Sequence, residues 1–300
     1  MNSNCFDVGY YALITLNDYL KKTYGEKVYK VALNAGCSCP NRDGSIGYGG
    51  CIFCSKMGSG NFAQDENLSV TEQIERGKSL VKAKGANKYI AYFQAFTNTY
   101  APTDYLRSIY YEAVSHPDIV AVSIATRPDC LPKEVLSLLS EINSIKPVWV
   151  ELGLQTIHSK TAELIRRGYD LCVYDEALKN LSDIGISQII THVILGLPYE
   201  TKEEMLETVR YVADSKSNGI KLQLLHVLKN TDLATMYGQG LFEVLSMEEY
   251  VDIVAECIKC LPPDMVVHRM TGDGDKKELI APMWSTDKKR VLNAIHEALK

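Results

Sequence analysis

Short apolar stretches alternate along this chain with segments in which apolar residues recur every three or four positions. The apolar stretches carry few charges, which is typical of strands buried on both faces, whereas the second pattern is typical of helices with one buried face. The predicted strands are 27–34, 89–96, 119–125, 147–153, 186–195, 220–226 and 265–268. The predicted helices are 11–24, 69–84, 104–115, 132–142, 160–165, 173–181, one that is capped at 201, 246–261 and one from 286 to the C-terminus.

This alternation of strand and helix predicts a parallel sheet with helices on the outside. About six or seven strand–helix units favour a barrel, complete or split, over a flat doubly wound sheet. Neither a Gly-x-Gly-x-x-Gly nor a Walker motif follows any predicted strand, which argues against an open nucleotide-binding sheet. Since there is no internal repeat or low-complexity linker, we expect one domain over 1–300. Its parts are a helix and first strand in 1–36, a cysteine-rich loop in 37–61, and a barrel with the last helix in 62–300.

The loop after the first predicted strand holds four cysteines among glycines. Cys51 and Cys54 have the C-x-x-C spacing with which two thiolates bind one metal centre. Cys39 lies twelve positions before Cys51, and Cys37 competes with it for the place of third ligand. Three thiolates around a cluster leave one metal position open for chemistry. A closed structural zinc site would need a fourth ligand, which here would have to be Cys37.

Composition narrows the choice of function and compartment. The 300 residues carry a formal charge of -5, so no overall basic field attracts nucleic acid or anionic lipid. Nine cysteines, four of them in one loop, indicate thiolate chemistry in a reducing compartment rather than a disulfide framework. There is no signal peptide and no apolar stretch near the ~20 residues of a membrane span, so we expect a cytoplasmic protein without a membrane partner.

Polar residues gather where the predicted strands end, which is where the active sites of α/β barrels lie. Polar side chains within apolar strands are costly unless they are partnered, so their recurrence at successive strand ends indicates a shared site. Besides the loop cysteines, these residues are 94–100, 126–129, Glu151, Gln155, Thr156, His192, 196–198, Gln223, His226, His268, Arg269 and Asp273.

Some of these residues also have ordinary structural interpretations. His226 and His268 are as compatible with a packed core or rim as with a substrate site, and the pair 166–167 is as compatible with a solvated helix end. Cys257 and Cys260 repeat the C-x-x-C spacing. They fall within an amphipathic helix, however, where buried thiols pack as small apolar side chains.

A C-x(n)-C-x-aromatic-C loop after the first strand of a βα barrel resembles the radical S-adenosylmethionine (radical SAM) superfamily. Here the aromatic residue is Phe53, between Cys51 and Cys54. The string Cys39-Pro-Asn-Arg-Asp-Gly44, followed by Gly49-Gly-Cys-Ile-Phe-Cys54, is similar to the YhcC/YtqA-type branch, whose core is similar to that of the Elongator catalytic subunit. Further matching segments are 92–102, 126–131, 151–155 and 268–274, so the resemblance covers nearly the whole chain.

The chain departs from the family pattern at three places. Eleven residues separate Cys39 from Cys51, whereas most superfamily members have three, and the longer spacing is typical of the branch. Cys37 stands where the branch usually has an aromatic residue. Tyr199 stands where a glycine commonly follows the Leu-Pro of the fifth strand.

The resemblance implies two cofactors and a set of roles. Cys39, Cys51 and Cys54 would hold three irons of a [4Fe–4S] cluster, and the fourth iron would bind the amine and carboxylate of S-adenosylmethionine (SAM). A low-potential donor of the flavodoxin or ferredoxin type would reduce the cluster. Reductive cleavage of SAM would then give an adenosyl radical that abstracts hydrogen from the substrate. The implied cofactor contacts are Phe53 on the adenine, Thr97, Asn98 and Thr99 on the methionine amine, Arg127 or Arg167 on its carboxylate, Glu151 and Gln155 on the ribose, and Gly196 and Pro198 beside the adenine.

The residues left for catalysis on the substrate are His226, His268, Arg269 and Asp273. The resemblance further implies tRNA as the partner, with conversion of a carboxymethylaminomethyl side chain on the wobble uridine to the aminomethyl form. Arg269 or Lys229 would then hold the carboxylate of the substrate. Two other functions stay open at this point: a radical SAM enzyme acting on a small metabolite, and a non-enzymatic scaffold that binds zinc.

Overall fold

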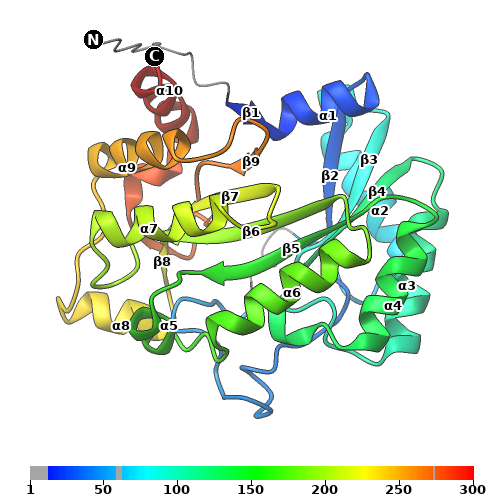
Figure 1. Cartoon of the computed structure of the whole chain (residues 1–300), viewed down its shortest axis with the longest axis horizontal. Helices are drawn as coiled ribbons and strands as arrows, with labels where there is room; N and C mark the ends of the chain where they lie inside the picture. Colours follow the sequence, from blue (N-terminus) through cyan, green and yellow to red (C-terminus); the bar gives the residue numbers. More distant parts are fainter. Residues whose placement is uncertain (1–12, 59–62, 273) are drawn as a thin grey trace, which may run out of the picture.

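One curved parallel sheet forms the centre of the molecule (Figure 1). The computed structural model describes residues 13–58, 63–272 and 274–300. Within these residues the sheet has eight strands in the order β1-β9-β7-β6-β5-β4-β3-β2, and every neighbouring pair is parallel. No described residue pairs β1 with β2, so the barrel is open on the side where these two edges face each other. The prediction of a split α/β barrel is therefore confirmed.

The strands of the sheet are β1 Ile14–Thr15, β2 Val28–Leu33, β3 Lys88–Phe93, β4 Ile119–Thr126, β5 Val148–Gln155, β6 Gln188–Leu195, β7 Gly219–Leu224 and β9 Val266–Arg269. A separate antiparallel pair consists of β8 Val227–Leu228 and β10 Leu279–Ala281. The helices are α1 Leu16–Tyr24, α2 Val70–Val81, α3 Thr103–Ser115, α4 Lys133–Asn143, α5 Ser159–Leu164, α6 Leu171–Asp183, α7 Lys202–Ala213, α8 Asp232–Gly238, α9 Met247–Lys259 and α10 Lys288–Ala298.

Each predicted strand and helix has a counterpart, with shifted ends. Capping boxes are present at Ser69, Thr201 and Ser246, where each hydroxyl accepts a hydrogen bond from the amide three residues later. The sheet has eight strands instead of the predicted six or seven because the two-residue β1 is too short to show a period. The short elements β8, β10 and α8 escape prediction for the same reason. None of the described helices is long and apolar enough to span a bilayer.

Side chains that point into the barrel form layers along the strands. The lowest layer is apolar, and helix α1 packs beneath it through Leu16 and Leu20. This layer consists of Val28, Ile90, Ala121, Trp149 and Ile190. Two residues further along each strand, on the same face, the next layer is polar and consists of Lys30, Tyr92, Ser123, Glu151, His192 and Lys221. The bottom of the barrel is thus sealed by apolar packing, and a polar layer separates this seal from the carboxyl ends of the strands.

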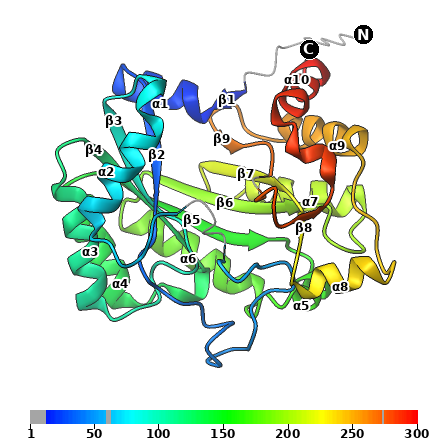
Figure 2. The ribbon, with the colours of Figure 1, turned by 180° about the vertical axis from the view of Figure 1, so that it is seen from behind.

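The long loop after β2 lies at these carboxyl ends. In Figures 1 and 2 it is the blue trace that extends below the sheet, on the side opposite α1. Helices α2, α3 and α4 cover one side of the outer surface, and α6 and α7 cover the adjoining part. Helix α2 packs tightly on β2 at Gly77. A Cβ built there would lie 2.0 Å from Cγ1 of Val31 in β2. A glycine is therefore required for α2 to approach β2 this closely.

Candidate active site

Cys39, Cys51 and Cys54 line one cavity at the carboxyl ends of the strands. Phe53 and Gln155 line it with them, and we call this space the cluster cavity. Burial raises the pKa of the Cys51 thiol to about 12, and the neighbouring Cys54 and Cys39 add to that rise. Burial also raises the pKa of Cys54, with Cys39 again contributing. The three thiols thus lie close enough to repel one another as thiolates, which is the arrangement that a bound cation relieves.

Two polar side chains of the loop hold it against the barrel. Nδ2 of Asn41 donates a 2.6 Å hydrogen bond to the carbonyl of Arg166 and lies 3.6 Å from Sγ of Cys51. The guanidinium of Arg42 donates to the carbonyls of Cys54, at 3.3 Å, and Ser55, at 2.5 Å. The bond of Asn41 to Arg166 holds the loop against the barrel. The contact of Asn41 with Cys51 and the bonds of Arg42 join the first half of the loop to the second half, so they fix the positions of the cysteines relative to one another.

Cys37 lies outside the cluster cavity. Its side chain is 6% exposed and packs in the main hydrophobic core, where its thiol is 3.9 Å from the carbonyl of Ala35. Burial raises its pKa to about 12, and its described electrostatic neighbours are Tyr105 and Tyr110 rather than the other loop cysteines. Cys257 is likewise packed in the core, within α9, as the amphipathic pattern predicts.

Gln155 combines backbone strain with an unsatisfied polar atom. Its φ is +71°, a left-handed conformation that is rare for residues other than glycine, asparagine and aspartate. Its Oε1 is buried and has no hydrogen-bond partner among the described residues. A Cβ at Gly153 would lie 2.9 Å from Nε2 of Gln155, so the glycine leaves room for this amide. Strain and an orphan acceptor at the wall of a cavity are typical of a ligand-binding residue.

Two arginines predicted for the cofactor carboxylate both line the cluster cavity. Arg127 forms a two-point ion pair with Asp129, at 2.9 Å from Nε and 2.7 Å from Nη2. Arg167 is 4% exposed and donates to backbone carbonyls, including that of Thr156 at 2.6 Å. Both guanidinium groups lie over the ring of Tyr169, at 5.1 and 4.6 Å from its centroid. The two side chains are therefore held rigidly. Arg127 is already paired with a carboxylate, whereas the described acceptors of Arg167 are neutral carbonyls.

The other predicted cofactor residues divide into two groups. Thr97 lines the cluster cavity. Asn98 instead donates to the carbonyls of Phe93 and Ala125, at 3.1 and 2.9 Å, and so ties the ends of β3 and β4 together. Thr99, whose Oγ1 is 2.5 Å from Oγ1 of Thr126, lines a different surface groove. The loop residues Gly196 and Pro198 are absent from the described walls of the cavities, and Gly196 packs on Leu245.

Glu151 is the centre of the polar layer, and its side chain is completely buried. Its carboxylate receives contacts from the five other strands that contribute to this layer. The partners are Lys30 at 2.5 Å, Ser123 at 2.8 Å, Tyr92 at 2.9 Å, His192 at 2.7 Å and Lys221. Burial alone would raise the pKa of Glu151, but Lys221, Lys30 and His192 together hold it well below its usual range.

Beyond Phe53 the cluster cavity continues into a second space, which we call the distal cavity. The two share Phe53, Cys54, Gly58, Gln94, Gln155 and His192. The distal cavity is further lined by Gln223, His226, Arg269, Gly272 and Gly274. A Cβ at Gly272 would lie 2.4 Å from Cε1 of His226, so the loop after β9 passes directly over this imidazole. Asp273 lies outside the described residues.

The imidazoles here are neutral at physiological pH. Burial lowers the pKa of His192 to about 4, and the nearby Lys221 adds to this. Its Nε2–H therefore donates a hydrogen bond to Glu151. Burial also lowers the pKa of His226 to about 4, and its Nε2 is buried without a partner among the described residues. His268 lies lower in the barrel, where its ring meets that of Trp149 edge-on.

The model of the radical SAM superfamily matches residues 39–212, and that of a radical SAM C-terminal domain matches residues 217–300. The chain belongs to the radical SAM superfamily. The uncharacterized protein YtqA of Bacillus subtilis is 47% identical over 287 residues, which cover 95% of this chain and 89% of that protein. Protein YhcC of Escherichia coli K12 is 40% identical over 266 residues, which cover 88% of this chain and 85% of that protein. These relatives support the resemblance to the YhcC/YtqA-type branch.

Proteins of the Elongator type share the core but are longer. A tRNA uridine(34) acetyltransferase of Methanocaldococcus jannaschii is 28% identical over 158 residues, which cover 51% of this chain and 28% of that protein. A solved structure of Elp3 from Methanocaldococcus infernus superimposes with a TM-score of 0.67 at 17% identity, covering 90% of this chain and 63% of that one. This structural likeness confirms the fold.

The cavity also fits the cofactors on which this superfamily depends. Three thiols that line one cavity supply the soft ligands that an iron–sulfur cluster requires. The orphan Oε1 of Gln155 supplies an acceptor for a hydroxyl group, and Arg167, whose described acceptors are neutral backbone carbonyls, supplies positive charge for a carboxylate. The donors thus match both a cluster and a ligand with hydroxyl and carboxylate groups.

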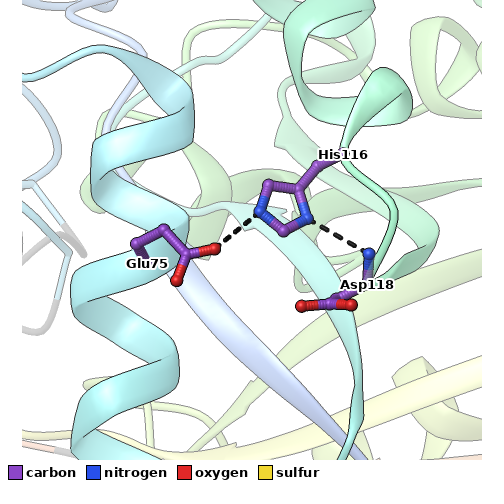
Figure 3. A group of neighbouring side chains, drawn as sticks. All are labelled: Glu75, His116 and Asp118. Carbon is purple, nitrogen blue, oxygen red and sulfur yellow. Dashed lines mark hydrogen bonds and ion pairs between the residues drawn. The ribbon is translucent and has the colours of Figure 1, made fainter.

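A further group of possible metal ligands lies at the opposite end of the sheet. Figure 3 shows Glu75 from α2, His116 after α3 and Asp118 before β4. Their ligand atoms lie within 4.8 Å of one another. The ammonium of Lys78, however, contacts Glu75 at 2.7 Å and Asp118 at 2.6 Å. Because a lysine already supplies the positive charge between these carboxylates, we assign no metal to this group.

Both lysines of the polar layer escape recognition in the sequence. Lys30 and Lys221 are single lysines inside apolar strands. They are not among the polar residues at the strand ends, because both lie before those ends. The alternation of faces along each strand could identify them. Lys30 points to the same face as Val28, two positions before it, and Lys221 points to the same face as Gln223, two positions further on.

Proposed function

We propose that this protein acts on the side chain of the wobble uridine in tRNA and converts its carboxymethylaminomethyl group to the aminomethyl form. The observation that carries the proposal is the polar wall of the distal cavity, beside Phe53. This wall presents three amides, two neutral imidazoles and one guanidinium: Gln94, Gln155, Gln223, His192, His226 and Arg269. Amides and imidazoles suit the donors and acceptors of a pyrimidine base, and a guanidinium suits a carboxylate.

In this proposal Cys39, Cys51 and Cys54 hold the [4Fe–4S] cluster. Phe53 packs on the adenine of SAM, Gln155 accepts a hydrogen bond from its ribose, and Arg127 or Arg167 lies beside its carboxylate. When bound, the cluster and SAM supply the radical that abstracts hydrogen from the substrate. The surrounding side chains enclose the site and keep water away from that step.

Arg269 is the better candidate for the substrate carboxylate. It lines the distal cavity, whereas the Nζ of Lys229 donates a 2.7 Å hydrogen bond to the carbonyl of Lys277 on the exposed surface. His226 would contact the base through its unpartnered Nε2. Because His226 is neutral, it can accept or donate a hydrogen bond without bringing a charge next to the base.

The partner proteins and nucleic acids follow from the same proposal. A low-potential donor of the flavodoxin or ferredoxin type would reduce the cluster. The tRNA partner is supported by the name of the 28% identical relative, a tRNA uridine(34) acetyltransferase.

The experiment compares wobble-uridine nucleosides in tRNA from cells with and without the protein. We expect carboxymethylaminomethyl uridine to accumulate in cells that lack it and in cells that carry only the Cys54→Ala variant. Reconstituted enzyme with SAM, a reductant and that tRNA should form the aminomethyl nucleoside. Unchanged nucleosides, together with 5′-deoxyadenosine formation in the presence of a small metabolite, would favour the metabolite enzyme instead.

A further inference from the structure

A third cavity opens on the side of the barrel, between the edge strand β2 and strand β9. We call it the side cavity. Its outer wall is formed by helix α2 through Gly77, Leu80 and Val81. Its inner wall reaches the polar layer at Lys30, Tyr92 and Lys221, and continues to His268 and Arg269. The side cavity contains none of the loop cysteines, so it is distinct from the cluster cavity.

The described lining of the side cavity is cationic. It contains Lys30, Lys84, Lys221 and Arg269, and no Asp or Glu is among the described residues that line it. Lys221 is 4% exposed, so its charge is largely removed from water. Buried charges are costly unless an opposite charge compensates them.

The one carboxylate within reach is shared between two ammonium groups. Lys30 and Lys221 both contact Glu151, which also accepts hydrogen bonds from Tyr92, Ser123 and His192. One negative charge therefore compensates two positive charges, and its oxygens have no room for further partners. Burial lowers the pKa of Lys221 to about 7, and burial lowers that of Lys30 as well. Both shifts are those of ammonium groups that lack a full counter-charge.

His268 adds an independent sign of a missing ligand. It lines the side cavity, and both of its ring nitrogens are buried without a hydrogen-bond partner among the described residues. A Cβ at Gly219 would lie 3.0 Å from Nε2 of His268, so the imidazole packs directly against Gly219. Buried imidazole nitrogens are nearly always paired. A ligand that accepts a hydrogen bond from His268 and compensates an adjacent ammonium would satisfy both groups at once.

We propose that the side cavity is an anion-binding site, which takes a carboxylate or phosphate group between Lys221, Lys30 and His268. The site is separate from the proposed reaction and does not require the cluster. Because Arg269 and Gln94 line both the side and the distal cavity, the anion is either a free small molecule or the anionic end of the substrate. Either source would present a carboxylate or phosphate group to the same side chains.

The test uses cluster-free protein and titration calorimetry with sodium acetate and with inorganic phosphate, at constant ionic strength set by sodium chloride. We expect saturable binding of one anion per chain. Lys221→Met removes the charge but keeps an unbranched side chain, and it should weaken binding about tenfold to a hundredfold. Lys229→Met is the matched control, since this lysine lies on the surface outside the side cavity, and it should bind as the wild type does.

Absence of saturable binding, or equal affinity in wild type and Lys221→Met, would overturn the proposal. Circular dichroism checks that each variant is folded. If Lys221→Met does not fold, His268→Phe replaces it, because Phe keeps the ring and removes both nitrogens. His268→Phe should then weaken binding about tenfold, and unchanged affinity would count against the site. Competition between acetate and substrate in turnover identifies the substrate's own anionic group as the ligand, and acetate binding without competition identifies a free anion.

Discussion

Nε2 of His192 lies 2.7 Å from the carboxylate of Glu151, and the side chain of Glu151 is completely buried. The two residues come from neighbouring strands and form the floor of the cluster cavity, which both line. Lys30 and Lys221 approach the same carboxylate from β2 and β7. With Tyr92 of β3 and Ser123 of β4, six strands are thus joined through one carboxylate directly below the site, so the shape of the site depends on Glu151.

Replacing Glu151 by Gln should destabilise the protein by about 3–5 kcal/mol, because Lys30 and Lys221 would lose their only described counter-charge. Since the pKa of Glu151 is lowered in the folded state, its contribution is present above the unfolded pKa of about 4.3 and is lost as the pH falls below it. Urea unfolding of cluster-free protein at neutral pH measures the loss. Glu203→Gln removes an exposed ion pair and should cost at most about 1 kcal/mol. Equal losses in the two variants would contradict this account.

Anion binding in the side cavity should weaken as the pH rises. The groups that face Lys221 are Glu151, Lys30, Tyr92, His192, His268 and Arg269. His192 and His268 stay neutral and Glu151 stays ionised across the neutral range, so Lys221 is the described group of this set whose pKa lies there. The pKa of Lys221 is about 7 in the folded protein, and an anion binds its charged form. Acetate affinity should therefore fall by up to about tenfold per pH unit above pH ~7, and a flat profile in calorimetry would contradict this.

The strained Gln155 should separate stability from cofactor affinity. Gln155→Gly removes the left-handed strain at φ +71° and should keep or raise the stability, by up to about 1 kcal/mol. The same change removes the acceptor proposed for the ribose, so SAM should bind about tenfold more weakly. Gln223→Ala is the control, because Gln223 lines the distal but not the cluster cavity and should leave SAM affinity unchanged. Unchanged SAM affinity in Gln155→Gly would remove this residue from the cofactor site.

Arg42 should influence the cluster through charge as well as position. Arg42→Met removes a guanidinium that bonds to the carbonyls of Cys54 and Ser55. A nearby positive charge favours the reduced, more negative cluster, so the midpoint potential should become more negative, on the order of tens of millivolts. Redox titration followed by electron paramagnetic resonance measures the shift. The exposed Arg290→Met is the control, and equal potentials in the two variants would contradict the prediction.

Gly77 should tolerate no side chain. Alanine usually stabilises a helix relative to glycine by about 1 kcal/mol. At Gly77, however, the new Cβ would lie 2.0 Å from Val31, so Gly77→Ala should instead destabilise by about 1–3 kcal/mol. At Gly238, in α8, no atom lies within 4 Å of a built Cβ, and Gly238→Ala should be neutral or stabilising. Urea midpoints compare the two, and a stable Gly77→Ala would mean that α2 does not pack on β2 as described.

The barrel could be predicted because its signals are local and repeated. Each long strand is an apolar run, and each of three helices begins with a capping box that the structure contains, as at Ser69. The cluster loop was equally accessible, since the spacing of Cys51 and Cys54 is itself the signal. The two-residue β1 was not accessible, because its pairing with β9 depends on residues about 250 positions away in sequence, Ile14 and Val266.

The contacts within the site depend on tertiary geometry, which the spacing of residues along the sequence does not determine. Asn98 and Thr99 follow Thr97 directly, yet their side chains bond to the ends of the neighbouring strand and loop rather than line the cluster cavity. Glu151 could be recognised as a polar residue in a strand. Its five partners come from five other strands, so the charge network around it becomes visible only when the sheet curves.

Anaerobic reconstitution with iron and sulfide, followed by reduction in the presence of SAM, tests the central claim most directly. The measurement is the formation of 5′-deoxyadenosine, with the cluster followed by electron paramagnetic resonance. We predict a [4Fe–4S] signal and 5′-deoxyadenosine in the wild type and in Cys37→Ala, and neither in Cys54→Ala. A colourless protein that binds zinc and forms no 5′-deoxyadenosine would contradict the account.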